Sequence, residues 1–217
     1  MKAALSAITV KTDRRDARGI AQLLRLGWFR PMHIKSASAH EVRSVLTARK
    51  LLQAKLLGVE SGIRGVLRGF GFKVDPISRG RVEARVSELV HGHSVLQQVA
   101  GAMLTARSAL QTAFARLHRM ILSLVRAAAV GRQLMSVPGV GAIVVITFKS
   151  RVDDPGRFRR SRDVGPHVGL TRRKYQFGEK DVTGSISKVG DRMVRTALYE
   201  AASVMHGRTV RMSALKA

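Results

Sequence analysis

Leu134-Met-Ser-Val-Pro-Gly-Val-Gly-Ala-Ile-Val-Val-Ile-Thr-Phe148 is the stretch around which the chain is organised. Its two glycines, Gly139 and Gly141, flank a single valine and allow a turn tight enough to bring main-chain N–H groups close to another backbone. If a helix follows, its first amides are unpaired and point outward at the positive end of the helix dipole, an arrangement that binds phosphate. The alternative is a plain turn before a buried strand, because the run from Ile143 to Thr147 is β-branched throughout. These residues alone favour neither structure.

The charge of the whole chain favours the phosphate-binding interpretation. The 217 residues include 39 Lys and Arg against 14 Asp and Glu, which gives a formal net charge of +25. Self-repulsion on this scale is tolerated mainly when a polyanion neutralises it, so nucleic acid is the first candidate partner and a membrane surface the second. The pattern Val-Pro-Gly-Val-Gly-Ala at residues 137–142 resembles the hairpin of helix-hairpin-helix modules, which bind nucleic-acid backbones independently of sequence.

Composition also excludes several classes of protein. No apolar run approaches the ~20 residues needed to span a bilayer, so no membrane-spanning segment is expected. The sequence contains no cysteine, which excludes disulfides, a thiolate nucleophile and cysteine-ligated zinc. Residues 1–10 are too short, and too soon followed by charge, for a secretory signal. A reduced, cytoplasmic setting fits these features.

A short helix is predicted near the N-terminus, from about Asp13 to Leu26, with Thr12 as its cap. Asp13 and Asp16 then lie at positions i and i+3 on one helix face. Two such carboxylates can contribute to a Mg²⁺ site, usually as part of a larger set of oxygen ligands. The alternative is that the helix dipole favours acidic residues here and that neighbouring arginines pair with them. The residues alone favour this alternative.

Residues 36–130 form the longest coherent unit, a heptad pattern with a break at residues 71–79. Ser38-Ala-His-Glu41 matches a capping box at the start of the first helix. The second helix, over residues 82–124, is predicted to be on the order of 60 Å long. The two helices form an antiparallel hairpin or coiled coil, and their seams pack either on each other or on another subunit. His93 and Arg107 interrupt the seam, whose apolar members are Leu52, Leu56, Val59, Ile63, Val66, Phe70, Val82, Val86, Leu89, Leu96, Ala100, Met103, Leu110, Phe114, Leu117, Ile121 and Leu124.

Beyond Gly131, the chain carries two clusters of basic residues. Asp154 is predicted to cap a short helix that begins at Pro155, and Asp191 to cap the last helix. Tyr175 and Phe177 interleave with the second basic cluster, and this combination suits backbone contact plus base stacking. The alternative is a solvated loop whose aromatic side chains pack into the core. The clusters are Arg159, Arg160 and Arg162, then Arg172, Arg173 and Lys174.

The order of these motifs resembles the DEDD-type insertion-sequence transposases, also called Piv-like or bridge-RNA-guided recombinases. The resemblance covers nearly the whole chain. Residues 11–17 resemble the end of the family's RuvC-like nuclease domain, and the heptad unit resembles its connecting coiled coil. The family's C-terminal transposase domain is matched by Leu134–Met205, with the motifs Val137-Pro-Gly-Val-Gly141, Asp153-Asp-Pro-Gly-Arg-Phe158, Gly169-Leu-Thr171 and Ile186-Ser-Lys-Val-Gly-Asp191.

The resemblance implies a covalent serine–DNA link, with Mg²⁺ held by the DEDD carboxylates, and a guide RNA as a possible partner. Asp13 and Asp16 match the last two acidic residues of the set, whereas the first Asp and the Glu have no counterpart in this sequence. Phe177 stands at the position expected for the serine, ahead of Gly178. Mg²⁺ is therefore expected to bind poorly, and the chain is expected to be a truncated transposase that is inactive alone.

The sequence as a whole predicts a mainly α protein in four parts. These are a RuvC-like remnant at residues 1–35, the helical hairpin at 36–130, a compact transposase domain with a helix-hairpin-helix at 131–207, and a tail at 208–217. The expected function is DNA binding in transposition, with oligomerisation through the coiled coil. The alternatives are a non-enzymatic architectural nucleic-acid-binding protein and an oligomerisation partner of a full-length transposase. The expected DNA contacts come from Gly139, Gly141, Arg159, Arg160, Arg172, Arg173, Lys174 and Lys188.

Overall fold

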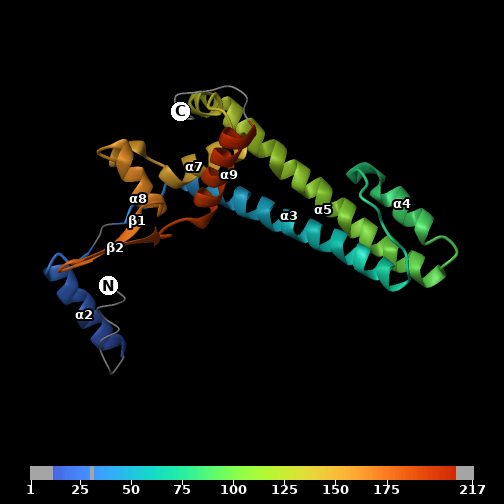
Figure 1. Cartoon of the computed structure of the whole chain (residues 1–217), viewed down its shortest axis with the longest axis horizontal. Helices are drawn as coiled ribbons and strands as arrows, with labels where there is room; N and C mark the ends of the chain where they lie inside the picture. The colour runs from blue at the N-terminus through green and yellow to red at the C-terminus, as the bar shows by residue number, and fades with distance from the viewer. Residues whose placement is uncertain (1–11, 30–31, 209–217) are drawn as a thin grey trace. The chain divides into compact units, whose positions relative to one another are not determined.

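The computed structural model describes residues 12–29 and 32–208, and the chain divides into two units, Met1–Lys35 and Ser36–Ala217 (Figure 1). In the first unit, helix α2 spans Asp13–Arg25. Its cap is Thr12, whose hydroxyl accepts a hydrogen bond from Arg15 N at 3.3 Å, so the predicted start of this helix is confirmed. Lys11, the first residue of the nuclease-like motif, and the tail from residue 209 lie outside the described residues.

The second unit is built on two long helices that run side by side, α3 (Ala37–Gly69) and α5 (Ser94–Ala127) (Figure 1). The predicted capping box at Ser38–Glu41 is wrong, because α3 is capped by Ser36, whose Oγ accepts from Ala39 N at 3.2 Å. Ser36 is held in place by Asp153, which accepts hydrogen bonds from Ser36 N at 2.8 Å and Ser36 Oγ at 2.7 Å. A contact 117 residues away along the chain therefore sets where α3 begins.

The prediction of one helix over residues 82–124 is also wrong. A 3₁₀ turn at Arg79–Arg81 leads into α4 (Val82–Leu89), and the chain then turns at Val90–His93 before α5 begins. Gly92 makes this turn possible with φ of +85°. Because α4 folds back on α5, the seam at this end is buried within the chain, in a core made of Ile63, Leu67, Val82, Val86, Val90, Leu96, Ala100 and Leu104.

Arg107, one of the two polar interruptions of the seam, is buried with a matched set of partners. Its Nε donates to Glu60 Oε1 at 3.0 Å, and one of its terminal nitrogens donates to the Arg79 carbonyl at 3.0 Å. The ion pair joins α5 to α3, and the carbonyl contact holds the turn that leads into α4. The second interruption, His93, contacts the ring of Phe72 edge-on.

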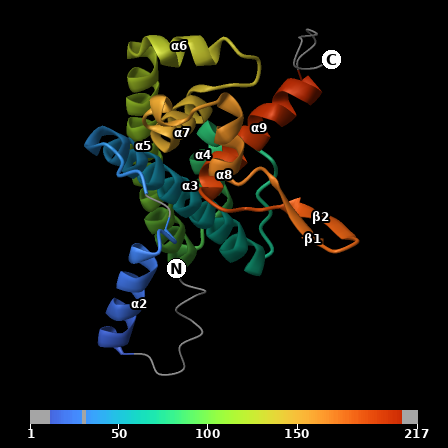
Figure 2. The same ribbon diagram turned by 90° about the vertical axis from the view of Figure 1, so that its left-hand side faces the viewer.

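The C-terminal part of the second unit contains α6 (Ala129–Met135), α7 (Ala142–Val152), α8 (Val164–Val168) and α9 (Arg192–Arg208). Two 3₁₀ turns, Pro155–Arg157 and Ser161–Asp163, lie between α7 and α8. Two antiparallel strands, β1 (Arg172–Phe177) and β2 (Lys180–Ile186), pair only with each other in the described part of the chain. Figure 2 shows this pair extending away from the helices around α7.

Helix α7 contains the apolar run that follows Gly141. Ile143–Thr147 is helical, so the strand alternative is wrong. Val145 and Ile146 are buried against Leu46 of α3 and against Ile121 and Val125 of α5, and this tertiary packing overrides the β preference of the run. The prediction of a mainly α fold is confirmed. Within residues 12–29 and 32–208, no helix is long and apolar enough to cross a membrane.

Candidate nucleic-acid interface

The turn between α6 and α7 places its two glycines in different surroundings. Gly139 has φ of +81°, and a Cβ on it would lie 2.4 Å from the Ala201 carbonyl oxygen of α9. Gly139 therefore lets the turn pack directly on α9. Gly141 is exposed at the start of α7, and a Cβ there would meet nothing within 4 Å of the described atoms. Backbone contact with phosphate at this turn stays a prediction, and Gly141 is the glycine with open space beside it.

The first basic cluster, which includes Arg159 and Arg160, lies on a loop that is held by side-chain contacts. Asp154 caps the turn at Pro155–Arg157 by accepting from Gly156 N at 2.8 Å, as predicted. Arg157 contacts His167 Nε2 at 2.7 Å, and its guanidinium lies 4.6 Å from the centre of the Phe158 ring. These contacts fix the loop from its inner side, while Arg159 and Arg160 are exposed.

The second basic cluster forms strand β1, which the sequence did not predict as a strand. Every residue of β1 is exposed, including Tyr175 at 62% and Phe177 at 89%. The alternative in which these aromatic side chains pack into the core is therefore wrong. Arg173 donates a hydrogen bond to the Ser187 carbonyl at 3.1 Å, which ties the base of the strand pair to the segment that leads into α9.

A groove lies at the base of this strand pair. Its volume is about 570 Å³, and Lys188, Arg192 and Arg195 supply its cationic side chains. All its lining residues are described, and none is acidic; the others are Leu170, Ile186, Thr196 and Tyr199. Sequence reasoning found Lys188 and missed the α9 residues, although Arg192, Arg195 and Tyr199 follow the i, i+3, i+7 spacing of one helix face.

Two motifs of the resembled family build the wall of this groove by close backbone contact. Lys188 N donates to the Gly169 carbonyl at 3.1 Å, and Ser187 N donates to the Thr171 carbonyl at 2.8 Å. A Cβ on Gly169 would lie 2.0 Å from the Val189 carbonyl oxygen, so no other residue fits there without a backbone shift. Lys188 itself has φ of +55°, an uncommon conformation for a residue other than glycine, and its side chain is exposed.

Asp191 organises the charges behind the groove. Burial opposes its ionisation, but the hydrogen bond from Arg43 and the N–H groups of Met193 and Val194 outweigh burial and hold the pKa of Asp191 below its usual value. Its Oδ1 accepts from Met193 N at 2.8 Å, which confirms it as the cap of α9. Burial lowers the pKa of Arg151, and Asp191 acts in the opposite direction.

The residues implied in catalysis lie in different units of the chain. Asp13 and Asp16 lie on α2, which has no buried residue in the described part of the first unit. Among described residues, no group of three His, Cys, Asp or Glu side chains could hold a metal ion, and two carboxylates alone are a poor set for Mg²⁺. Phe177 lies in the second unit at the end of β1, opposite Lys180.

Comparison with known proteins finds similar sequences for this part of the chain. Residues 131–216 match the family described as Transposase IS116/IS110/IS902 family. The transposase for insertion sequence element IS1111A of Coxiella burnetii is 26% identical over 199 residues, which cover 90% of this chain and 55% of that protein. A probable family 20 transposase of Pseudomonas aeruginosa is 29% identical over 197 residues, 88% of this chain and 58% of the relative. The chain thus spans about half the length of these curated relatives. The interface described above lies within the residues that match this family, and the chain as a whole is similar to insertion-sequence transposases.

Proposed function

We propose that the chain provides the DNA-binding surface of an insertion-sequence transposase, an enzyme of site-specific DNA recombination. One observation carries this proposal. The groove lined by Lys188, Arg192 and Arg195 has no acidic residue among its described lining residues, and it opens at the base of an exposed basic strand pair. DNA phosphates are the polyanion that fits such a surface on a chain of +25 formal charge.

The contacts proposed are with the DNA backbone. Arg and Lys side chains on the groove, on the 159–160 loop and on β1 neutralise phosphates and release counterions, which gives affinity without reading the bases. Because this binding is independent of sequence, target choice in transposition requires a further component. The family resemblance implies a guide RNA in that role. A protein that acts on chromosomal DNA in this way works in the cytoplasm of a bacterial cell.

Catalysis is not assigned to this chain alone. Asp13 and Asp16 supply two carboxylates, and Phe177 carries no hydroxyl for covalent attack on phosphorus. The proposal is that cutting and joining require acidic ligands and a nucleophile from outside this chain. The alternative is an architectural nucleic-acid-binding protein. It would use the same DNA-binding surface but would not act together with acidic ligands and a nucleophile from another chain.

Self-association through the helical hairpin forms a separate part of the proposal. Leu51 and Leu57 of α3 and Met120 and Leu124 of α5 are exposed by 39–57% although the hairpin tip buries its own seam. Apolar side chains in this position suit pairing with a second copy of the chain.

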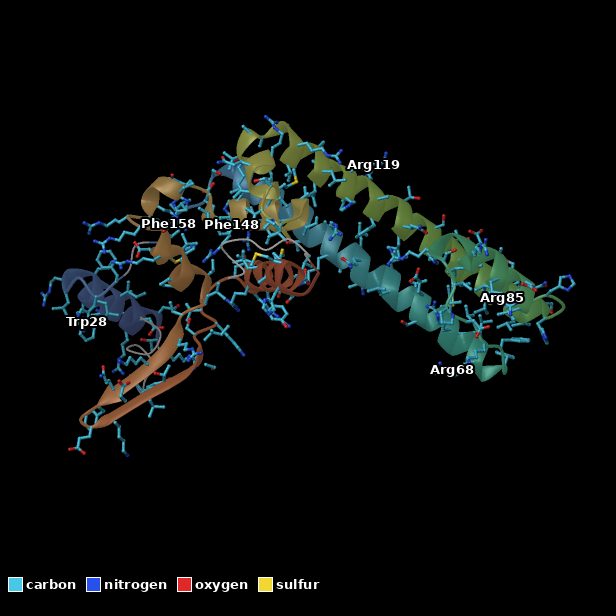
Figure 3. All side chains as sticks on the ribbon, turned by 45° about the horizontal axis from the view of Figure 1, so that its top comes forward. Trp28, Arg68, Arg85, Arg119, Phe148 and Phe158 are labelled. Carbon is cyan, nitrogen blue, oxygen red and sulfur yellow. The ribbon has the colours of Figure 1, made fainter. Side chains whose placement is uncertain are left out.

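The DNA surface is tested with two matched double variants. Lys188→Asn with Arg192→Gln removes two charges from the groove, and asparagine tolerates the positive φ at position 188. The tip variant, Arg68→Gln with Arg81→Gln, removes two exposed charges, one at the end of α3 and one just before α4; Figure 3 shows Arg68 remote from Phe158.

Binding to several unrelated duplexes is then measured at one salt concentration. We expect the wild-type chain to bind all of them with similar affinity, the groove variant to bind roughly tenfold more weakly or worse, and the tip variant to match the wild type. Equal losses in the two variants, or strong preference of the wild-type chain for one duplex, would contradict the proposal.

A further inference from the structure

The strand pair β1–β2 has two chemically different faces. Tyr175 lies opposite Val182, and Phe177 lies opposite Lys180. Because opposed residues share a face and alternate residues of a strand return to it, these four side chains lie on one face. Arg173 has no cross-strand partner, since the ladder is irregular between Arg172 and Lys174, and alternation along β1 places it on the same face as Tyr175. This is the aromatic face. The other face carries the pairs Lys174 with Thr183 and Gln176 with Asp181, and Arg172, paired with Ile186, lies at its base.

On the other face, Asp181 pairs with Lys174, and Arg172 is the remaining cation. Lys174 Nζ lies 3.1 Å from Asp181 Oδ2, and Gln176 Nε2 donates to the same oxygen at 3.3 Å. On the aromatic face, by contrast, Arg173 and Lys180 are the charged members and no carboxylate is present among the described strand residues. The aromatic face therefore carries two cations without a carboxylate, whereas the other face carries two cations and one carboxylate.

The aromatic side chains are exposed to an unusual degree. Phe177 is 89% exposed, Tyr175 62% and Val182 56%. Tyr175 and Phe177 are two residues apart in one strand, so their rings project in the same direction about 7 Å apart. An exposed apolar surface flanked by charge is typical of a binding site.

We propose that the aromatic face of β1–β2 binds single-stranded DNA, with bases stacked on Tyr175 and Phe177 and phosphates near Arg173 and Lys180. Aromatic rings beside cations are the chemistry that binds unpaired nucleotides without sequence preference. Duplex DNA does not offer this contact, because its base faces are covered by neighbouring bases. The inference rests on the proposed DNA binding and adds to it an unpaired strand as the ligand of one defined face.

The position of the face supports a strand rather than an isolated nucleotide. Ile186, the last residue of β2, and Leu170, just before β1, both line the basic groove. A strand that leaves a duplex bound at the groove therefore meets the base of the aromatic face directly. Arg173 stands at this junction, held by its hydrogen bond to the Ser187 carbonyl.

The test compares an oligo-dT strand with a duplex of the same length, for the wild-type chain and for Tyr175→Ala with Phe177→Ala. We expect the double variant to lose roughly tenfold or more in affinity for oligo-dT and to keep duplex affinity within about twofold. Tyr175→Phe with Phe177→Tyr keeps both rings and is expected to bind like the wild type. Thr183→Ala on the other face is the matched control and is expected to bind both ligands like the wild type.

A direct readout of stacking comes from Phe177→Trp in a Trp28→Phe background. Stacking on the new indole should quench its emission when oligo-dT is added and leave it unchanged when duplex is added. Loss of binding in the ring-conserving variant, equal losses on both ligands in the alanine variant, or an unquenched indole would overturn the inference.

Further ligands separate this inference from its competitors. The face offers no group that requires a 2′-hydroxyl, so oligo-U should bind no more tightly than oligo-dT, and tighter binding of oligo-U would overturn the assignment to DNA. Tighter binding of anionic lipid vesicles than of oligo-dT would overturn it in favour of a membrane surface. If the wild-type chain binds duplex but not oligo-dT, this inference alone fails; if it binds neither, the proposed function fails with it.

Discussion

Arg43 of α3 forms a salt bridge with Asp191, the residue that caps α9. The Asp191 side chain is only 10% exposed, so this contact connects the helical hairpin to the segment that matches the transposase family through a largely buried charge. Lys188 and Arg192, which line the basic groove, lie three residues before Asp191 and one after it. The salt bridge therefore holds the groove in a fixed position against α3.

The first prediction is a loss of stability in acid that depends on Asp191. Its pKa is lowered in the folded chain, so its contribution is present above the unfolded value of about 3.9 and is lost as the pH falls through the folded value. Urea midpoints measured from pH 6 to pH 3 should fall more steeply for the wild-type chain than for Asp191→Asn. Asp181→Asn, which breaks an exposed pair with Lys174, should keep the wild-type pH dependence. Parallel curves for the wild type and Asp191→Asn would show that the salt bridge contributes nothing.

The second prediction concerns the buried pair Glu60 and Arg107, whose side chains are 11% and 5% exposed. Glu60→Ala leaves the Arg107 charge buried without its carboxylate and should cost about 3–5 kcal/mol of unfolding free energy. Replacing both residues, with Glu60→Leu and Arg107→Met, should recover most of that loss. Urea unfolding measures both, and Arg85→Ala, which breaks an exposed pair with Glu88, should change stability by less than about 1 kcal/mol. A double variant as unstable as Glu60→Ala would mean that the loss of stability comes from altered packing of α4 and not from an unpaired buried charge.

The third prediction separates the two glycines of the α6–α7 turn. Gly139→Ala places a Cβ against the Ala201 carbonyl at a positive φ, and should destabilise the chain by about 1–3 kcal/mol. Gly141→Ala meets open space at φ of −90° and should change stability by less than about 0.5 kcal/mol. Thermal or urea unfolding of the two variants tests this difference directly. Similar stability in both would mean that the turn does not pack on α9 as described.

The fourth prediction is that the chain alone neither cuts nor joins DNA. Phe177 has no attacking oxygen, and Asp13 with Asp16 offers two carboxylates on an exposed helix. Incubation with DNA, Mg²⁺ and total cellular RNA should give no covalent protein–DNA adduct on a denaturing gel, and Phe177→Ser should behave in the same way. An adduct that forms with the unmodified chain and disappears in Ser185→Ala or Ser187→Ala would contradict this and identify the nucleophile.

The features predicted correctly from sequence are those fixed by a few neighbouring residues. Thr12, Asp154 and Asp191 each accept a hydrogen bond from an N–H two or three residues ahead, and this local contact is visible in the residue types alone. The cap of α3 was misplaced because Ser36 is positioned by Asp153, which no local pattern reveals.

The features that were missed depend on contacts between distant segments. The heptad spacing continues from Val82 and Val86 to Leu96 and so predicts one long helix, although the chain turns at Gly92. The apolar residues on both sides of the turn are buried in one core, because α4 folds back on α5. The strands β1 and β2 were not predicted because their sequences lack the alternation of apolar and polar residues that indicates a strand. Neither face of the pair packs on a core, so this alternation is not required. Arg192, Arg195 and Tyr199 could have been found as one face of the last helix, but only the structure shows that they border a groove with Lys188.

The salt dependence of duplex binding tests the central claim, a phosphate-binding groove beside β1–β2, most directly. Affinity is measured across a salt series for the wild-type chain, the groove variant Lys188→Asn with Arg192→Gln, and the tip variant Arg68→Gln with Arg81→Gln. We expect a steep slope of log affinity against log salt for the wild type, a slope shallower by about 2 for the groove variant, and an unchanged slope for the tip variant. A flat wild-type slope, or the same reduction in both variants, would contradict it.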